Sequence, residues 1–422
     1  MQALSLQGRK FADLFSASGL ERLDAEFFQH LGETQPDLAE RLRVYRTAAE
    51  APAALQTSEL LLACAPLLEA FIARLFGIAA EAAAARTKVL AQDVVMDFKK
   101  HYVLRRARRY RGEITRSLAD LDAWLDDQIA RAGGPAHGDR EGAIAQLGEA
   151  WLQDEPAHAD AVDRLTQWCV LVLKDAQAAP RREGWASFHL PERVDHAHLV
   201  PLVRMDRHGA AMQASETLRR RDGFHLTDPR ADARTVQDEV HYCLYCHDHE
   251  GDFCSRGFPE KKGVPELGLK KDPLGVTLTG CPLEEKISEM HRLKRDGYGV
   301  AALAMAMVDN PMVPATGHRI CNDCMKACVY QKQDPVNIPQ IETHVLTDVL
   351  ALPWGVEIYD LLTRWNPLRR TQYLMQPYNG RKVLVAGMGP AGFTVAHHLS
   401  QEGCAVVGID GLKIEPLPRH LL

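Results

Sequence analysis

The sequence has no uninterrupted apolar run of the length that a membrane-spanning helix needs. Its longest apolar stretch, residues 60–78, carries Pro66, Glu69 and Arg74, and each of these is costly at the centre of a spanning helix. We therefore expect a buried core helix there and no membrane span. The first fifteen residues also lack the basic start, apolar core and cleavage site of a secretory signal. Both absences predict a cytoplasmic protein.

Positive charge is not in excess either. The 422 residues hold 50 lysines and arginines against 56 aspartates and glutamates, which gives a formal net charge of −6. This balance carries no overall signature of nucleic-acid binding, so no nucleic-acid partner is expected. The run Arg105–Arg111 is locally basic, and we interpret it as an exposed or docking helix face, with an anionic partner as the alternative. Hydrophobic residues make up 46% of the chain, which is enough to bury sizeable cores.

The first 235 residues show helical periodicity and no repeat of 20 to 50 residues, which argues against a solenoid. Ser18 and Glu21 predict a capping box, after which Leu20, Leu23 and Phe27 recur on one helical face. Residues 178–234 show no clear period. Further helices are expected at about 35–50, 56–78, 79–104, 114–131 and 143–176.

Cysteine is scarce outside one block of the chain. Seven of the ten cysteines fall between Cys243 and Cys328. The other three, Cys64, Cys169 and Cys404, lie in apolar patterns and are expected to be packing residues. In a reducing compartment, clustered cysteines indicate a metal site rather than disulfides.

The spacing of the block distinguishes two kinds of metal site. It reads Cys243-x2-Cys246-x7-Cys254, then Cys281-Pro282, then Cys321-x2-Cys324-x3-Cys328, with two helices expected between residues 283 and 307. One tetrahedral zinc site needs four thiolates, and Cys243, Cys246, Cys321 and Cys324 could supply them. Two [4Fe-4S] clusters need eight ligands, and a Cys-Pro pair is typical of two-cluster ferredoxins. We favour two clusters and keep zinc as the alternative.

The stretch that begins CPLEEKISEMHRLKRDGYGV and contains TGHRIC and PVNIPQIE resembles the two-cluster domain of the glutamate synthase small subunit and dihydropyrimidine dehydrogenase family, over about residues 238–350. The resemblance implies an α-helical, two-cluster ferredoxin-like domain with interleaved ligands. Its first ligand set would be Cys243, Cys246, Cys254 and Cys328, and its second set Cys281, Cys321, Cys324 and Glu342. The gaps of seven and twenty-six residues exceed those of the family, so residues 255–280 are expected to loop out and to present lysines to an acidic redox partner.

Residues 381–410 read as a strand, a glycine-rich turn, a helix and a second strand that ends in an acid. This order predicts a dinucleotide-binding βαβ unit, whose glycines let the backbone approach a pyrophosphate at the helix N-terminus, while the acid accepts from a ribose hydroxyl. The resemblance implies FAD as the ligand. The candidate binding residues are Gly387, Gly389, Pro390, Ala391, Gly392 and Asp410.

The unit is an incomplete Rossmann fold, because only two of its strands are present and no second glycine fingerprint follows. We expect the rest of the flavoprotein, with its NAD(P)H site, to lie downstream in a longer polypeptide or to be a separate chain. A two-strand parallel unit cannot bury both faces of its sheet alone.

The sequence therefore predicts a mainly α protein with four parts: a helical domain (1–132), a helical to irregular region (143–235), a two-cluster domain (236–350) and a partial FAD-binding βαβ unit (379–422). The expected function is the electron-transfer portion of an NAD(P)H-linked FAD and iron–sulfur oxidoreductase, with a redox partner protein or domain. No catalytic acid, base or nucleophile is nominated. The alternatives are a zinc-stabilised interaction or regulatory module and a truncated fragment without turnover.

Overall fold

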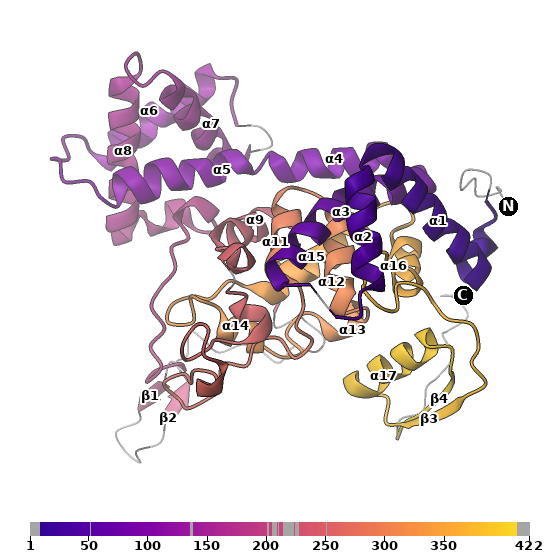
Figure 1. Cartoon of the computed structure of the whole chain (residues 1–422). Helices are drawn as coiled ribbons and strands as arrows, with labels where there is room; N and C mark the ends of the chain where they lie inside the picture. The colour runs from indigo at the N-terminus through magenta and orange to yellow at the C-terminus, as the bar shows by residue number, and fades with distance from the viewer. Residues whose placement is uncertain are drawn as a thin grey trace.

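The computed structural model describes residues 9–50, 52–135, 138–200, 202–204, 209, 211–213, 223, 228–249 and 251–411. Helices dominate these residues, and the strands form only two short pairs, which confirms the predicted mainly α class. Part of the segment predicted to be irregular, residues 178–234, lies outside the described residues. Figure 1 shows two helical bodies joined by α4 (Ala79–Leu90), with a small strand-containing unit at the C-terminal side.

The first hydrophobic core joins helices from the start of the chain to helices from its second half. Leu20, Leu23 and Phe27 are fully buried in it, as their spacing predicts. Trp365, from the far end of the chain, packs edge-on against Phe27. The helices of this core are α1 (Ala17–Thr34), α2 (Pro36–Thr47), α3 (Ala54–Phe76), α9 (Ala233–Tyr242), α11 (Ile287–Arg295), α12 (Gly299–Asp309), α13 (Val313–Thr316), α15 (Ile338–Leu350) and α16 (Gly355–Arg364).

The cap of α1 differs from the predicted one. Ser16, in extended conformation, is the N-cap, and its hydroxyl accepts from the backbone N–H of Gly19 at 3.2 Å. The predicted Ser18 and Glu21 capping box is therefore wrong, because the helix already begins at Ala17. A 3-10 helix, η1 (Phe11–Phe15), ends directly before Ser16 and fixes where the chain can turn into α1.

The second core is formed by residues from the middle of the chain and contains Trp168, which is fully buried. One expected helix over residues 143–176 is two helices, because the turn at residues 154–158 contains Pro156. Proline removes a backbone donor and disfavours the helical conformation of the residue before it. The elements of this core are α5 (Asp93–Phe98), its π-helical continuation (Lys99–Ala107), α6 (Leu118–Arg131), α7 (Arg140–Gln153), α8 (Ala159–Lys174) and the 3-10 helix η5 (Ala186–Phe188), with η4 (Ala176–Arg182) after α8.

The chain passes from the first core to the second through α4, which has no buried residue of its own, and α9 of the first core also contacts α5 and η5 of the second. The bounds 1–132, 143–235, 236–350 and 379–422 stay a prediction, because a hydrophobic core shows packing and not which segments fold alone.

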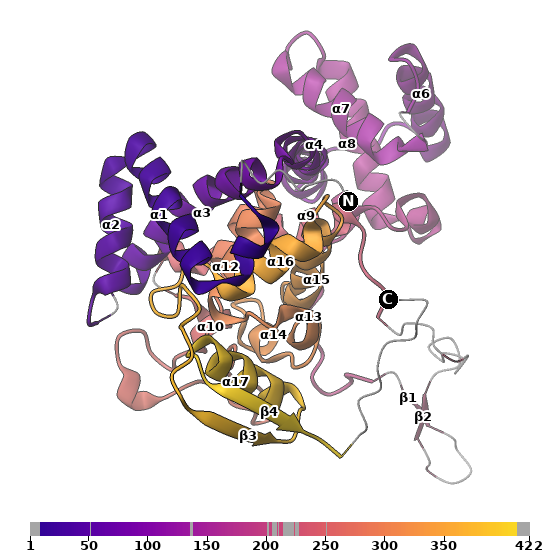
Figure 2. The same ribbon diagram turned by 90° about the vertical axis from the view of Figure 1, so that its right-hand side faces the viewer.

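The strands lie outside both cores. β1 (Leu202–Arg204) and β2 (Ala211–Gln213) are antiparallel, while β3 (Lys382–Ala386) and β4 (Ala405–Ile409) are parallel and connected through α17 (Pro390–Gln401). Figure 2 shows α17 on the side of the β3–β4 pair that faces the helical body. The opposite side is open, and Leu384 and Val407 are more than half exposed there.

The apolar stretch at residues 60–78 lies mostly in α3 and is buried in the first core, so its prediction as a core helix is confirmed. No helix in the described part of the chain has the length and apolarity to cross a membrane. The carboxylate of Glu69, inside this stretch, accepts from the backbone N–H of Ala301 at 2.9 Å and thereby caps α12. A negative charge at a helix N-terminus is favourable, because the free N–H groups point toward it.

This cap gives a test of the contact between the N-terminal helices and the rest of the first core. We expect Glu69→Ala to lower the free energy of unfolding by about 1–3 kcal/mol, since the buried N–H of Ala301 loses its acceptor. Denaturant unfolding followed by circular dichroism measures the change. Glu59→Ala is the matched control, because Glu59 is an exposed glutamate on the same helix, and equal loss in both variants would contradict the capping role.

Candidate functional site

Short helices and turns around α11 and α12 position the cysteines of the block. Cys243 is the C-cap of α9, and Cys246 begins the 3-10 helix η7 (Cys246–His249). Cys254 lies in α10 (Phe253–Arg256), which contacts α14 (Asp323–Ala327). All ten cysteines of the chain are unpaired thiols, and Cys64 and Cys169 are fully buried packing residues as predicted.

The first predicted ligand set lines one cavity. Cys243, Cys246, Cys254 and Cys328 all line one small cavity of about 20 Å³, and apolar side chains such as Ile338 form much of the remaining wall. Burial raises the pKa of Cys243 to about 12 and that of Cys246 to about 11, and the nearby Cys328 thiol adds to both shifts. The four sulfur atoms are therefore close enough to repel one another if several of them ionise.

The residues of the second predicted ligand set also lie close to one another. Burial raises the pKa of Cys324, and the next causes are Glu342, Cys281, Glu285 and Cys321, in that order. Burial likewise raises the pKa of Cys281 to about 12, with further contributions from the two glutamates. The carboxyl groups of Glu285 and Glu342 are hydrogen-bonded to each other, and burial raises the pKa of both. Sequence reasoning missed Glu285, although it lies only four positions after Cys281.

Backbone N–H groups already point at several of these sulfur atoms. The N–H of Tyr245 donates to Sγ of Cys243 at 3.5 Å. Cys328 receives backbone hydrogen bonds that lower the pKa of its thiol against the stronger effect of burial. Hydrogen bonds of this kind favour the thiolate, which is the form that binds metal. A bound cation would overcome the remaining cost of burial, because a coordinated thiol loses its proton.

A single metal ion does not fit this arrangement. Among the residues that the structure describes, no three His, Cys, Asp or Glu side chains lie close enough to share one ion. The alternative zinc set is divided, since Cys243 and Cys246 line the first cavity while Cys321 and Cys324 neighbour Glu342. In a [4Fe-4S] cluster each thiolate binds a different iron, so its four sulfur ligands stand further apart than those of one zinc ion. The four cysteines of the alternative zinc set are therefore not gathered at one point.

The insertion at residues 255–280 does not separate Cys254 from its set. The backbone N–H of Cys281 donates to the carbonyl of Cys254 at 2.9 Å, so the chain leaves and returns at one point. Gly257 and Gly280 make this close approach possible, since both have positive φ and a Cβ on Gly280 would lie 2.5 Å from the nitrogen of Gly257. Sequence reasoning missed both glycines; the position of Gly280 directly before Cys281 was the available signal.

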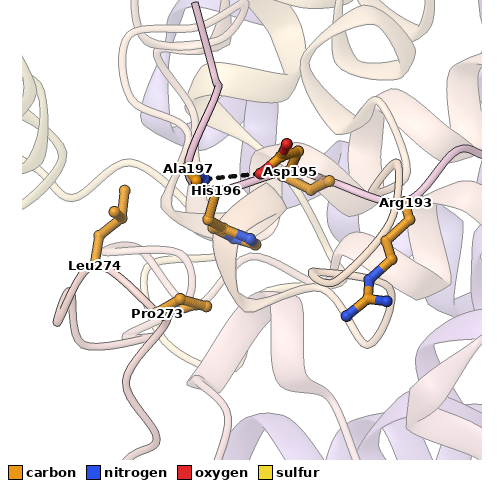
Figure 3. Close-up of a pocket in the computed structure, with 7 residues that line it drawn as sticks. Arg193, Asp195, His196, Ala197, Pro273 and Leu274 are labelled. Atoms are coloured by element: carbon orange, nitrogen blue, oxygen red, sulfur yellow. Dashed lines mark hydrogen bonds between the residues drawn. The ribbon is translucent and has the colours of Figure 1, made fainter.

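A surface hollow lies beside this insertion. Figure 3 shows it between Pro273 and Leu274 of the insertion and the segment 193–197, where Asp195 accepts from the backbone N–H of Ala197 at 2.9 Å. None of its lining residues is a cysteine. The described residues that line the hollow are all at least partly exposed, so it is not where either cysteine set gathers.

The glycine-rich turn has the close backbone packing that its sequence predicts. Gly387 has a φ of 95°, and a Cβ on Gly392 would lie 1.8 Å from the carbonyl oxygen of Gly387, so only glycine fits there. Gly389 has open space around it and precedes Pro390 at the start of α17, which Ala391 continues. These features suit the approach of an anionic phosphate to a helix N-terminus.

Asp410 follows β4 and bends back onto the turn. Its carboxylate accepts from the backbone N–H of Met388 at 2.5 Å. This contact places the acid at the same edge as the glycines, at the carboxyl ends of the two parallel strands, where nucleotides bind in open α/β sheets.

The start of the chain matches a known family of domains. The family described as RP005 N-terminal alpha-helical domain matches residues 4–77, a range that ends just after α3. The uncharacterized protein RP005 of Rickettsia prowazekii (strain Madrid E) is 28% identical over 290 residues, which are 66% of this chain and 94% of RP005. No solved structure was found to match the chain.

Two further kinds of relative match smaller parts of the chain. The uncharacterized protein RP006 of the same Rickettsia strain is 59% identical over 106 residues, which are 25% of this chain and 15% of RP006. The small chain of glutamate synthase [NADPH] from Mycobacterium tuberculosis (strain CDC 1551 / Oshkosh) is 31% identical over 128 residues, which are 30% of this chain and 23% of that protein. The chain thus spans less than a quarter of the length of either relative, and its similarity to the glutamate synthase small chain is distant and partial.

Proposed function

We propose that this chain is the electron-transfer portion of an FAD and iron–sulfur oxidoreductase. The observation that carries the proposal is the arrangement of seven cysteines and Glu342 in two neighbouring groups of buried and half-buried side chains, each with four candidate ligands. The partial similarity to a protein named glutamate synthase [NADPH] small chain supports the oxidoreductase class. The resemblance of the cysteine block supplies the finer assignment of two [4Fe-4S] clusters.

Each group of residues has a distinct task in this proposal. The thiols lining the cavity hold one cluster, and Cys281, Cys321, Cys324 and Glu342 hold the other. When bound, the clusters supply one-electron transfer, and FAD supplies the exchange between hydride and single electrons. The hydrogen bond between the backbones of Cys254 and Cys281 keeps the two groups adjacent. The glycine turn and Asp410 hold the dinucleotide part of FAD.

The missing parts of the flavoprotein would complete the βαβ unit. The side chains of Leu384 and Val407, which are paired across β3 and β4, are both more than half exposed. Parallel sheets are normally covered on both faces. We propose that the remaining flavoprotein portion, in a longer polypeptide or a separate chain, covers the face that carries these two side chains and contributes the NAD(P)H site.

Metal content tests the two ligand sets. We expect protein purified without oxygen to be brown and to carry about eight iron and eight sulfide per chain, as two cubane clusters require. Cys254→Ser and Cys281→Ser should each lower the iron content to about half, because each removes a ligand of a different set. Iron and acid-labile sulfide assays, with electron paramagnetic resonance of the reduced protein, measure the change.

Cys64→Ser is the control for these variants, because Cys64 is a buried cysteine outside both sets, and its iron content should equal that of the wild type. A colourless wild-type protein with one or two zinc ions would contradict the proposal and favour the zinc-stabilised interaction module. Full cluster content without any electron transfer from NAD(P)H would instead indicate the truncated fragment without turnover.

A substitution at Gly392, the most crowded position of the glycine turn, tests whether the turn binds FAD. We expect Gly392→Ala to weaken FAD binding at least tenfold, since the new methyl group would displace the carbonyl of Gly387 and reshape the turn. Titration of the chain with FAD, followed by flavin fluorescence, measures the affinity. Gly411→Ala is the control, because a Cβ there meets nothing within 4 Å. Equal affinity of both variants would contradict the assignment of the turn.

The insertion is tested as a docking surface for an acidic redox partner. Lys261 and Lys271 are exposed on it. We expect the double variant Lys261→Glu, Lys271→Glu to slow electron transfer to an acidic one-electron carrier protein several-fold at low salt, because steering between opposite charges is lost. The rate is measured over a range of salt concentrations. Lys88→Glu, an exposed change on α4, should leave the salt dependence unaltered, and the same slope in all proteins would contradict the docking surface.

A further inference from the structure

A buried histidine faces the cavity of the first cysteine set. His291 lies on α11 one turn after Ser288, and both side chains line the cavity that the four cysteines surround. Only 1% of His291 is exposed. Neither of its ring nitrogens has a hydrogen-bond partner among the residues that the structure describes.

This lack of a partner sets His291 apart from the other described residues that line the cavity. Buried polar atoms are nearly always hydrogen-bonded, so an unpartnered pair of nitrogens indicates a group that binds there. The hydroxyl of Ser288 is already hydrogen-bonded to Nδ1 of His247 at 2.6 Å. Of the described residues that line the cavity, His291 alone has a buried side-chain nitrogen or oxygen without a partner.

The ring of His291 can donate one hydrogen bond into the cavity. Burial lowers the pKa of His291, and the nearby His247 shifts it in the same direction. A neutral imidazole carries one N–H donor and one acceptor nitrogen. The polar atoms of the four cysteines are sulfur atoms, and an N–H beside metal-bound sulfur is a favourable donor.

We propose that His291 donates a hydrogen bond to a sulfur atom of the cluster held by Cys243, Cys246, Cys254 and Cys328, and so raises the reduction potential of that cluster. This inference rests on the proposed function, since it requires the cluster. Hydrogen bonds to the sulfurs stabilise the reduced, more negative state. The second set instead includes the carboxyl group of Glu342, which is hydrogen-bonded to Glu285, so the two clusters would differ in potential and an electron would reside preferentially on the first.

The test compares cluster potentials in the full chain. His291→Leu removes the donor at similar volume, His291→Gln keeps an N–H, and His249→Leu changes an exposed histidine near the same set. We expect His291→Leu to lower the equilibrium constant for reduction of one cluster about tenfold, or about 59 mV for a one-electron couple. The other cluster serves as an internal reference. His291→Gln should restore most of the shift, and His249→Leu should show none.

Each outcome decides between the inference and the function it rests on. Wild-type protein without iron and sulfide would overturn both, whereas full clusters with unchanged potentials in His291→Leu would overturn the inference alone. If His291→Leu loses the first cluster, pulsed electron paramagnetic resonance of wild-type protein labelled with ¹⁵N-histidine decides. Coupling of a histidine nitrogen to the reduced first cluster, lost in His291→Gln, would support the hydrogen bond, and no coupling would overturn it.

Discussion

The constraint on which the site depends is the burial of many acidic groups in one interior. Burial raises the pKa of Cys254 and Cys324, and neighbouring acidic groups add to it: other thiols of the first set for Cys254, and Glu342 and Glu285 for Cys324. Asp252 adds another acid near the first set, with a pKa raised to about 7 by burial and by the neighbouring Glu289. Burying so many ionisable groups is unfavourable unless positive charge joins them. Buried thiols with raised pKa values stay protonated, and the proposed clusters would supply the positive charge that lets them ionise.

The N-terminal helices contribute directly to this interior. The hydroxyl of Ser58 on α3 donates to Glu289 of α11 at 2.5 Å, and Glu69 caps α12. Both contacts connect residues separated by more than 230 positions. The segment whose role the sequence leaves open thus has at least one structural task, because it covers and fixes the two helices that position the cysteines.

Sequence reasoning was sufficient where a local pattern of residues determines which side chains are buried or which turn forms. Helical spacing identified Leu20, Leu23 and Phe27 as buried, and the glycine fingerprint identified a turn that only glycine can form at Gly392. Sequence reasoning failed where two nearby residues could both cap a helix, since Ser16 rather than Ser18 is the N-cap of α1. It also failed at Pro156, which divides one expected helix into two.

Other parts of the site depend on contacts that no local pattern reveals. The close approach of Gly257 and Gly280 requires the chain to return, after more than twenty residues, to the place where the insertion begins. The unpartnered state of His291 depends on what its neighbours bind, which spacing alone does not show. The ligand sets were predicted from the resemblance of the cysteine block, and their gathering into two groups could not be derived from spacing.

The order of segments in the first core also constrains how the chain is synthesised. α1 to α3 bury their apolar faces against α11, α12 and α16, which the ribosome makes at least 200 residues later. The second core lies wholly between these partners and is complete first. The apolar faces of α1 to α3 therefore stay exposed to solvent while the middle of the protein is synthesised and folds. A chaperone that shelters the nascent N-terminus would benefit this protein more than one whose domains close in the order of translation.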